Sequence, residues 1–285
     1  RRMPLRWPPA EDSHSLGAEL STGRGVIHRS SRDCWPRAFV SHSRCMASGR
    51  VIGVLSGCGG AGASVLAAVL AGCAAEPGGL GPGVTPGPVF LLDCDPMGGG
   101  IDVLLGCEQV PGPRWRQVHL RGGTLDPAVL LESLPRWNRV SFLAADSAAD
   151  LLPDAVDRVI GAASQAGTVV VDLPRWSSPV RAVALERCHR VVLVVPAEVR
   201  AVTAAALIAA GLDASRSTVA VRGTCRNLPA QRIGHLLGLP VIGEIPYDPT
   251  SSRPSGLNMS RLRRGSRRLA RAVLATGPSS CEAAA

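Results

Sequence analysis

VIGVLSGCGGAGASVLAAVLAGCAA (residues 51–75) joins an apolar run, a glycine-rich turn and an Ala/Leu-rich stretch. The apolar run 51–55 has the length of a buried strand, and the stretch 64–75 has the length of a helix. A glycine turn between a strand and a helix lets backbone N–H groups converge at the helix N-terminus, where they bind anions. The stretch therefore predicts an α/β domain with a phosphate-binding turn.

The letters of this turn satisfy two motifs. Gly57, Gly62 and Ser64 fit the P-loop pattern G-x-x-x-x-G-K-[ST], except that Ala63 stands where the phosphate-binding lysine belongs. With Gly59 added, the same glycines also fit the dinucleotide fingerprint G-x-G-x-x-G. All 31 basic residues of the chain are arginine, so no lysine elsewhere in the chain can replace the missing one.

Acidic residues farther along the chain favour the P-loop. Asp93 and Asp95 follow the second apolar run, 31 and 33 residues beyond Gly62. A dinucleotide site places its acid about 20 residues on, although a long glycine- and proline-rich loop could account for the excess here. A P-loop needs a hydroxyl after the lysine position and an acid ending another strand, and Ser64 and Asp172 provide both. We expect Asp93 to brace its turn and Asp95 to face the loop.

The rest of the chain predicts alternating strands and helices. Uninterrupted runs of Val and Leu indicate strands that are covered on both faces. Such alternation predicts an α/β fold with a doubly wound, mostly parallel sheet. The expected strands are 51–55, 88–93, 139–144, 167–172, 189–195, 217–222 and 241–245; the expected helices are 64–75, 126–134, 153–164, 178–187, 199–211, 229–237 and 257–275, with a short helix after the glycines at 98–100.

The two ends of the chain differ from this pattern. Residues 1–49 lack periodicity and are expected to be disordered or the remnant of a longer upstream region. Met46 precedes the first strand, so a start there would give a chain of 240 residues. We expect one domain over residues 50–276 and a disordered tail over 277–285.

Composition limits the possible functions. No apolar run reaches the roughly 18–20 residues that span a bilayer, and the first residues do not resemble a secretory signal, so a cytoplasmic location is expected. The nine cysteines form no Cys-x-x-Cys pair, which favours buried thiols over a metal site. The net charge of +9 comes from residues 1–50 and 253–271, whereas residues 51–252 carry −2. The central domain is therefore not a basic nucleic-acid binder.

Four segments together resemble one family. CGGAGAS (58–64), LLDCDPMGGGIDVLLG (91–106), TVVVDLP (168–174) and VIGEIPYD (241–248) have the order and spacing found in the MinD/ParA group of deviant Walker ATPases. They look most similar to its CpaE/TadZ and actinobacterial septum-site-determining (Ssd) branch, over residues 51–275. This resemblance implies a P-loop ATPase-like fold whose members position machinery at the division septum, on chromosomes or at pili.

The resemblance also implies roles for single residues. Asp95 is similar to the catalytic acid that orients water or metal, Ser64 to the magnesium-binding hydroxyl, and Asp172 to the Walker B acid, which also serves the metal. ATP and Mg²⁺ are the implied cofactors. The implied phosphate loop consists of Gly57, Gly59, Gly60, Ala61, Gly62, Ala63 and Ser64.

Three positions depart from the family pattern. Cys58 replaces the signature lysine that reaches across a dimer, Ala63 replaces the phosphate lysine, and Arg222 replaces an asparagine that contacts adenine. Phosphoryl transfer depends on positioning and charge, so losing two cations is expected to cost about three or more decades in rate. Nucleotide binding is expected to suffer less, because the backbone N–H groups remain.

Three functions remain open. The first is a spatial regulator of septum placement or Tad/Flp pilus localisation with a degenerate ATP site. Its expected partners are cell-division or pilus-assembly proteins, and a homodimer is an alternative partner state. The second is a working ATPase that cycles on membrane or nucleoid, for which an arginine or a partner residue must replace the lysine. The third, an NAD(P)-dependent oxidoreductase, is weakened because Tyr247 is the single tyrosine and no Tyr-x-x-x-Lys set exists.

The segment 257–275 is expected to form an amphipathic helix. Leu262, Ser266, Leu269 and Val273 project to one face, opposite five arginines. The favoured interpretation is the closing helix of the domain; contact with a membrane surface or with DNA are alternatives. Three tryptophans in or beside loops are candidates for a partner surface or for the core: Trp115, Trp137 and Trp176.

Overall fold

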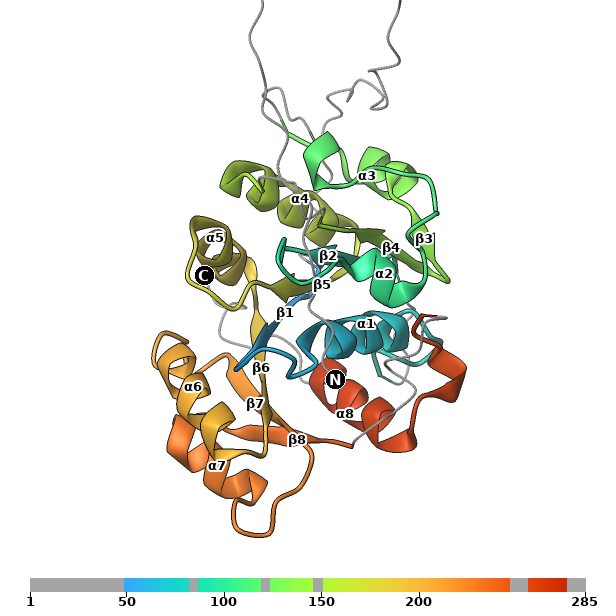
Figure 1. Ribbon diagram of the computed structural model, residues 1–285. Coiled ribbons are helices and arrows are strands. Elements are labelled where there is room, and N and C mark those ends of the chain that lie inside the picture. The colour runs from blue at the N-terminus through green and yellow to red at the C-terminus, as the bar shows by residue number, and fades with distance from the viewer. Residues whose placement is uncertain (1–48, 82–86, 119–123, 146–150, 247–255, 276–285) are drawn as a thin grey trace, which may run out of the picture. The chain divides into compact units, whose positions relative to one another are not determined.

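The computed structural model describes residues 49–81, 87–118, 124–145, 151–246 and 256–275 (Figure 1). The predictions of disorder at both ends concern residues that lie almost wholly outside these ranges, and they stay predictions. Among the described residues, no helix is both long and apolar enough to cross a bilayer.

The centre of the molecule is a sheet of eight strands in the order β3-β4-β2-β5-β1-β6-β7-β8. All neighbouring strands are parallel except β3, which pairs antiparallel with β4 at one edge. The doubly wound, mostly parallel α/β fold predicted from the sequence is therefore confirmed. The strands are β1 (Val51–Ser56), β2 (Val89–Asp93), β3 (Arg136–Trp137), β4 (Val140–Leu143), β5 (Thr168–Leu173), β6 (Arg190–Pro196), β7 (Ser217–Arg222) and β8 (Val241–Ile245).

Helices cover both faces of this sheet. One buried cluster joins the sheet to α1, α2 and α8, and the other joins it to α3, α4, α5, α6 and α7. Strand β1 sends Val51 and Leu55 to one cluster and Ile52 and Val54 to the other, as expected for a strand covered on both sides. The helices are α1 (Ala63–Ala74), α2 (Ile101–Leu105), α3 (Pro127–Ser133), α4 (Pro153–Ala166), α5 (Pro179–Arg187), α6 (Val199–Ala209), α7 (Ala230–Leu237) and α8 (Arg264–Ala275), with 3-10 turns η1 (Trp115–Gln117) and η3 (Met259–Arg261).

The last predicted helix is wrong in one respect. It does not run unbroken from residue 257, because η3 ends at an extended Leu262 and α8 begins only at Arg264. The Asn258 side chain accepts the backbone N–H of Ser260 and so starts a separate turn. The predicted apolar face is nevertheless correct, since Leu262, Ser266, Leu269 and Val273 are all buried.

Two of the three tryptophans are core residues. Trp115 and Trp137 are 4% and 6% exposed, so the partner-surface interpretation is wrong for them. The Trp115 indole N–H donates to the Asp93 carbonyl at 2.5 Å, which gives its one polar atom a partner inside the core. Trp176 remains 38% exposed. The cysteines of the described residues are free, and four of them are buried: Cys73, Cys94, Cys107 and Cys188.

Candidate functional site

The candidate site lies where strands β1, β2 and β5 end. A cavity of about 580 Å³ opens there, between the loop after β1 and the segments that follow β2 and β5. Parallel α/β sheets bind ligands outside the carboxyl ends of their strands, at the point where the strand order reverses. The cavity has that position, with β2 and β5 on one side of β1 and with β6 and β7 on the other.

The glycine loop forms an open cradle at the start of α1. Gly60 and Gly62 have φ values of 71° and 93°, a left-handed conformation that favours glycine. A Cβ added at Gly59 or Gly60 would meet no atom within 4 Å, so the space above these residues is open. The backbone N–H groups of Gly59, Gly60 and Gly62 have no acceptor in the described part of the chain. They are therefore available to an anion at the helix N-terminus.

Not every residue of the predicted loop lines the cavity. Gly59 to Ser64 do, but Gly57 does not. The Gly57 N–H donates to the Val194 carbonyl at 2.8 Å, and a Cβ there would come within 2.9 Å of Ala205. Gly57 is thus a glycine because α6 packs against it, and its backbone N–H belongs to the sheet.

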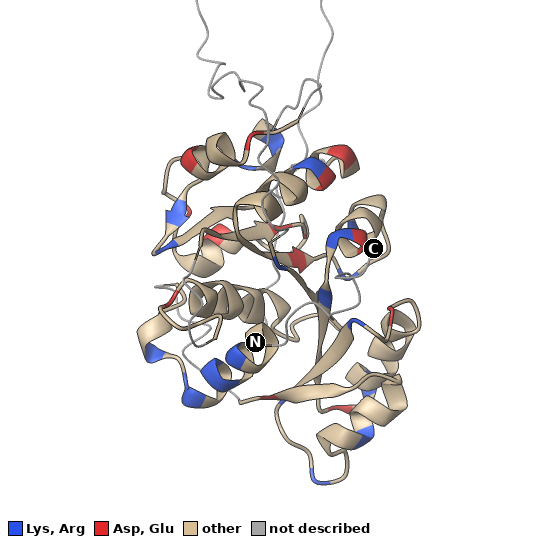
Figure 2. Cartoon of the chain, turned by 180° about the vertical axis from the view of Figure 1, so that it is seen from behind, with Lys and Arg blue, Asp and Glu red and all other residues tan. Residues whose placement is uncertain are grey.

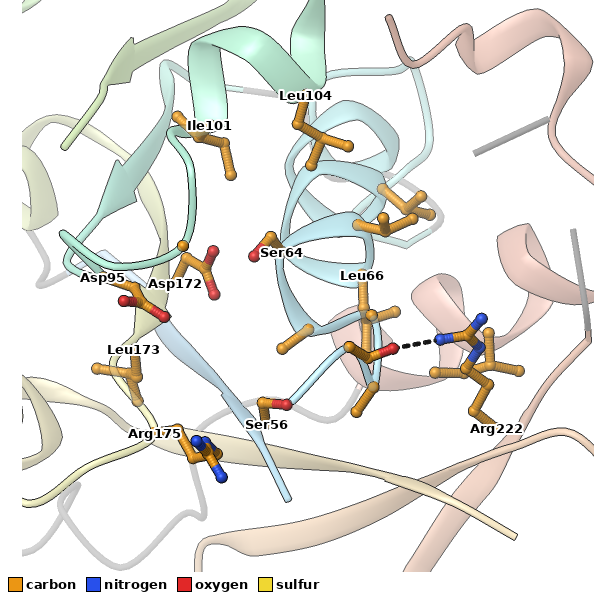
Figure 3. Close-up of a pocket in the computed structure, with 18 of the residues that line it drawn as sticks. Ser56, Ser64, Leu66, Asp95, Ile101, Leu104, Asp172, Leu173, Arg175 and Arg222 are labelled. Carbon is orange, nitrogen blue, oxygen red and sulfur yellow. Dashed lines mark hydrogen bonds between the residues drawn. The ribbon is translucent and has the colours of Figure 1, made fainter. Parts of the chain in front are cut away.

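Asp172 and Ser64 form the candidate metal pair. Asp172 is fully buried at the end of β5, close enough to the Ser64 hydroxyl at the start of α1 for that hydroxyl to lower its pKa against the effect of burial. Figure 3 shows the Asp172 carboxylate directed toward the Ser64 hydroxyl. Burial raises the pKa of Asp172 well above its ordinary value, and the neighbouring Asp93 charge raises it further.

The acids after β2 divide their roles as expected. Asp93 is buried and its two oxygens accept three backbone N–H groups, from Asp95, Ile101 and Ala145, at 3.0, 2.9 and 3.2 Å. Burial raises its pKa to about 6 against the effect of these bonds. Asp93 therefore braces the turn. Asp95 is half-buried, lines the cavity and accepts the Met97 N–H at 3.0 Å, and burial raises its pKa.

The residues present fit magnesium and phosphate. No group of three or more His, Cys, Asp or Glu side chains in the described ranges is placed to hold a metal ion. A P-loop site does not need one, because magnesium keeps several waters and binds mainly to phosphate oxygens and one or two protein groups. Ser64 and Asp172 supply a hydroxyl and an acid at the mouth of an open glycine cradle.

Two arginines line the same cavity. Arg222 ends β7, and its Nη1 donates to the Gly60 carbonyl at 2.6 Å (Figure 3). Arg175 follows β5, on the other side of the loop. The sequence singled out Arg222 only as a replaced base contact and did not single out Arg175. The available signal for Arg175 was its position in the sequence, three residues after Asp172.

The remaining wall of the cavity is apolar. It is formed by α1, the start of α2, the end of β8 and α8. Representative side chains are Leu66, Ile101, Ile245 and Leu269. An apolar wall beside a polar cradle suits a ligand with one flat or apolar part and one anionic part.

The strand order argues against a dinucleotide site. In the Rossmann order the first two strands are neighbours, so the acid that ends the second strand lies beside the first glycine turn. Here β5 lies between β1 and β2, and the acid beside β1 is Asp172. The long separation in sequence between Gly62 and Asp93 therefore reflects a different strand order, in which β2 is not adjacent to β1.

Comparisons with known proteins support the fold of the chain. No protein-family model matches the chain. It is 37% identical over 223 residues to "Uncharacterized protein Rv3660c" of Mycobacterium tuberculosis and to "Uncharacterized protein MT3760" of a second strain of that organism. Each match covers 76% of this chain, and the chain spans only 60% of the length of these relatives.

Several solved structures match a larger share of this chain, and of their own length, than these relatives do. The ParA family ATPase of Chlorobium tepidum has a TM-score of 0.59 at 19% identity, with 82% of this chain and 93% of that chain covered. The MinC:MinD cell division protein complex of Aquifex aeolicus gives 0.57 at 20%, covering 79% and 93%. The septum site-determining protein MinD of Pyrococcus horikoshii, complexed with Mg-ADP, gives 0.54 at 18%, covering 79% and 94%. The chain has the α/β fold of the MinD and ParA P-loop ATPases.

Proposed function

We propose that this protein is a MinD/ParA-like spatial regulator that binds ATP or ADP with Mg²⁺ in a degenerate P-loop. The observation that carries the proposal is the cavity in which an open glycine cradle, Ser64 and Asp172 meet without a lysine. Mg-ADP in the similar Pyrococcus horikoshii MinD supports the choice of ligand.

The proposed binding uses backbone N–H groups for the phosphates and an acid and a hydroxyl for the magnesium. The N–H groups of Gly59, Gly60 and Gly62 would hold the phosphates, and Ser64 and Asp172 would hold the magnesium, which neutralises phosphate charge when bound. Asp95 would orient a water molecule. Without a lysine at positions 58 and 63, we expect hydrolysis at most about a thousandth as fast as in a P-loop with both cations.

The cellular role that we propose is septum-site determination or localisation of a Tad/Flp pilus. It rests on the sequence resemblance to the CpaE/TadZ and Ssd branch and on likeness to a MinD solved in complex with MinC. Partners would be cell-division or pilus-assembly proteins, or a second copy of the chain. We place the protein in the cytoplasm, with peripheral contact to membrane or DNA through the arginines that Figure 2 shows along α8.

Titration calorimetry of the full chain with ATP and ADP tests this proposal. We expect binding that requires Mg²⁺ and is lost in Asp172→Ala. The matched control is Glu132→Gln, which removes an exposed acid from α3 and is expected to bind like the wild type. Absence of binding at millimolar nucleotide would refute the proposal and leave a scaffold without a ligand.

An active ATPase that cycles on membrane or nucleoid is the second candidate. The observation that favours it is the pair of arginines at the loop, because a cation there can replace a lysine. Phosphate release under saturating Mg-ATP separates the two candidates. A rate on the order of 1 s⁻¹, typical of enzymes, would establish the ATPase; a rate below about a thousandth of that supports the regulator.

A further inference from the structure

The loop has no cation of its own, yet two arginines from distant strands approach it. We infer that Arg222 and Arg175 together replace the missing lysines and bind the phosphate groups of a nucleoside di- or triphosphate. The inference rests on the proposed function and assigns the positive charge that this function requires.

Arg222 already contacts the phosphate loop. Its Nη1 donates to the Gly60 carbonyl, and it would lie 3.5 Å from a Cβ added at Gly62. A guanidinium has five N–H donors in a planar fork, so one bond to Gly60 leaves donors for an anion in the cradle. The contact joins residues 162 positions apart, and it places the guanidinium beside the unpaired backbone N–H groups.

Arg175 approaches from the other flank of β1. It follows β5, whereas Arg222 ends β7, and β1 lies between these strands in the sheet. Burial and Glu198 raise the pKa of the Cys58 thiol, and both Arg175 and Arg222 lie near enough to this loop residue to oppose that rise. Arg175 also opposes the rise that burial causes in the pKa of Asp95. The two cations therefore bracket the loop.

Neither arginine is committed to an ion pair. Among the described residues, no carboxylate lies within salt-bridge distance of Arg175 or Arg222. The acids of the site, Asp93, Asp95 and Asp172, would repel a phosphate that entered alone. Two permanently charged guanidinium groups offset this repulsion, and their fork matches phosphate oxygens better than a point charge does.

The test compares single variants of the full chain by titration calorimetry. The probes are Mg-ATP, Mg-ADP and magnesium tripolyphosphate, and the variants are Arg222→Gln and Arg175→Gln. We expect roughly 10- to 100-fold weaker binding of all three probes in each variant, as for the loss of a charged hydrogen-bond pair. Arg222→Lys keeps the charge but not the fork, and is expected to recover part of the affinity lost in Arg222→Gln.

Arg226→Gln is the matched control. This residue is exposed, lies four positions after Arg222 and does not line the cavity, so its variant is expected to bind within about twofold of the wild type. The melting temperature of every variant, measured without ligand, shows whether a loss of binding reflects a loss of fold.

Each other outcome has a separate meaning. Equal or tighter binding by Arg222→Gln would overturn the inference. The hydrogen bond from Arg222 to Gly60 would then hold the loop closed and would not contribute to phosphate binding. Weaker nucleotide binding with unchanged tripolyphosphate binding would overturn it too, because Arg222 would then contact the base. A wild type that binds none of the probes refutes the proposed function itself, whereas a wild type that binds and variants that bind equally refute only this inference.

Discussion

At the scale of the residue, the site is dominated by two buried acids in register on neighbouring strands. Asp93 and Asp172 are paired across β2 and β5. Each holds its proton more tightly in the folded chain than in the unfolded chain, because burial and mutual repulsion disfavour the charged forms. The arrangement costs folding free energy at neutral pH unless a cation enters. Raised pKa values of this kind, and the loss of stability that they cause, are typical of functional sites.

This cost predicts a pH-dependent effect of Asp172→Asn. The folded state binds more protons than the unfolded state between about pH 4 and the raised pKa of about 6 for Asp93, so stability falls as the pH rises through that window. Without Mg²⁺, the variant should gain about 1–3 kcal/mol of unfolding free energy at pH 7.5 and much less at pH 4.5. Guanidinium chloride denaturation at both pH values measures it.

The control for this experiment is Asp154→Asn, which changes an exposed acid on α4 whose ion pair with Arg158 lies on the surface and contributes little stability. It should shift stability by no more than about 0.5 kcal/mol at either pH. If Asp172→Asn destabilised the chain more at pH 7.5 than at pH 4.5, the repulsion between the two acids would be disproved.

Backbone conformation in the loop gives a second prediction. Gly62→Ala places a Cβ on a left-handed residue beside Arg222, and should cost about 1–2 kcal/mol of unfolding free energy. Gly59→Ala has open space and no left-handed φ, so its stability should stay close to that of the wild type. Thermal denaturation of the two variants measures the difference, and equal losses would contradict the loop geometry.

At the scale of the element, α8 is part of the core as well as a carrier of arginines. It packs against α1 and β8, and Arg267 forms an ion pair with Glu76 after α1 at 2.7 Å. Its apolar face could be predicted from helical periodicity. The interruption of the helix before Arg264 could not be predicted, because the amphipathic pattern continues without a gap through Asn258 and Leu262. The structure nevertheless places a cap at Asn258 and an extended residue at Leu262.

The packing of α8 predicts unequal effects of two alanine substitutions. Leu274→Ala empties a fully buried position outside the cavity and should cost about 2–5 kcal/mol of unfolding free energy. Arg268→Ala changes an exposed position of the same helix and should cost less than about 0.5 kcal/mol. Urea denaturation compares them. Similar small losses would mean that α8 does not belong to the core.

At the scale of the whole molecule, the sequence predicted the local parts of the site better than its distant parts. Continuous Val and Leu runs predicted seven strands, and the α/β class is confirmed. The two-residue strand β3 was missed, because Arg136 and Trp137 form too short a pattern. Asp172 and Ser64 could be paired from motif spacing, since parallel strands end at one edge of the sheet.

The arginines could not be placed in the same way. Contact between Arg222 and Gly60 depends on β7 lying two strands from β1, and that order is set by tertiary packing over 162 residues. The dinucleotide fingerprint failed for a related reason. Its letters are present, but the strand order puts β5 where the second strand of a Rossmann fold would lie.

Hydrogen–deuterium exchange of the full chain with and without Mg-ADP tests most directly whether a loop without lysine binds a nucleotide. The N–H groups of Gly59, Gly60 and Gly62 have no acceptor in the described residues, so they should exchange fast in the free protein. With Mg-ADP, we predict slower exchange in peptides that cover residues 58–66, and no change in Asp172→Ala. Unchanged exchange of this loop at saturating nucleotide would contradict the proposal that it binds phosphate.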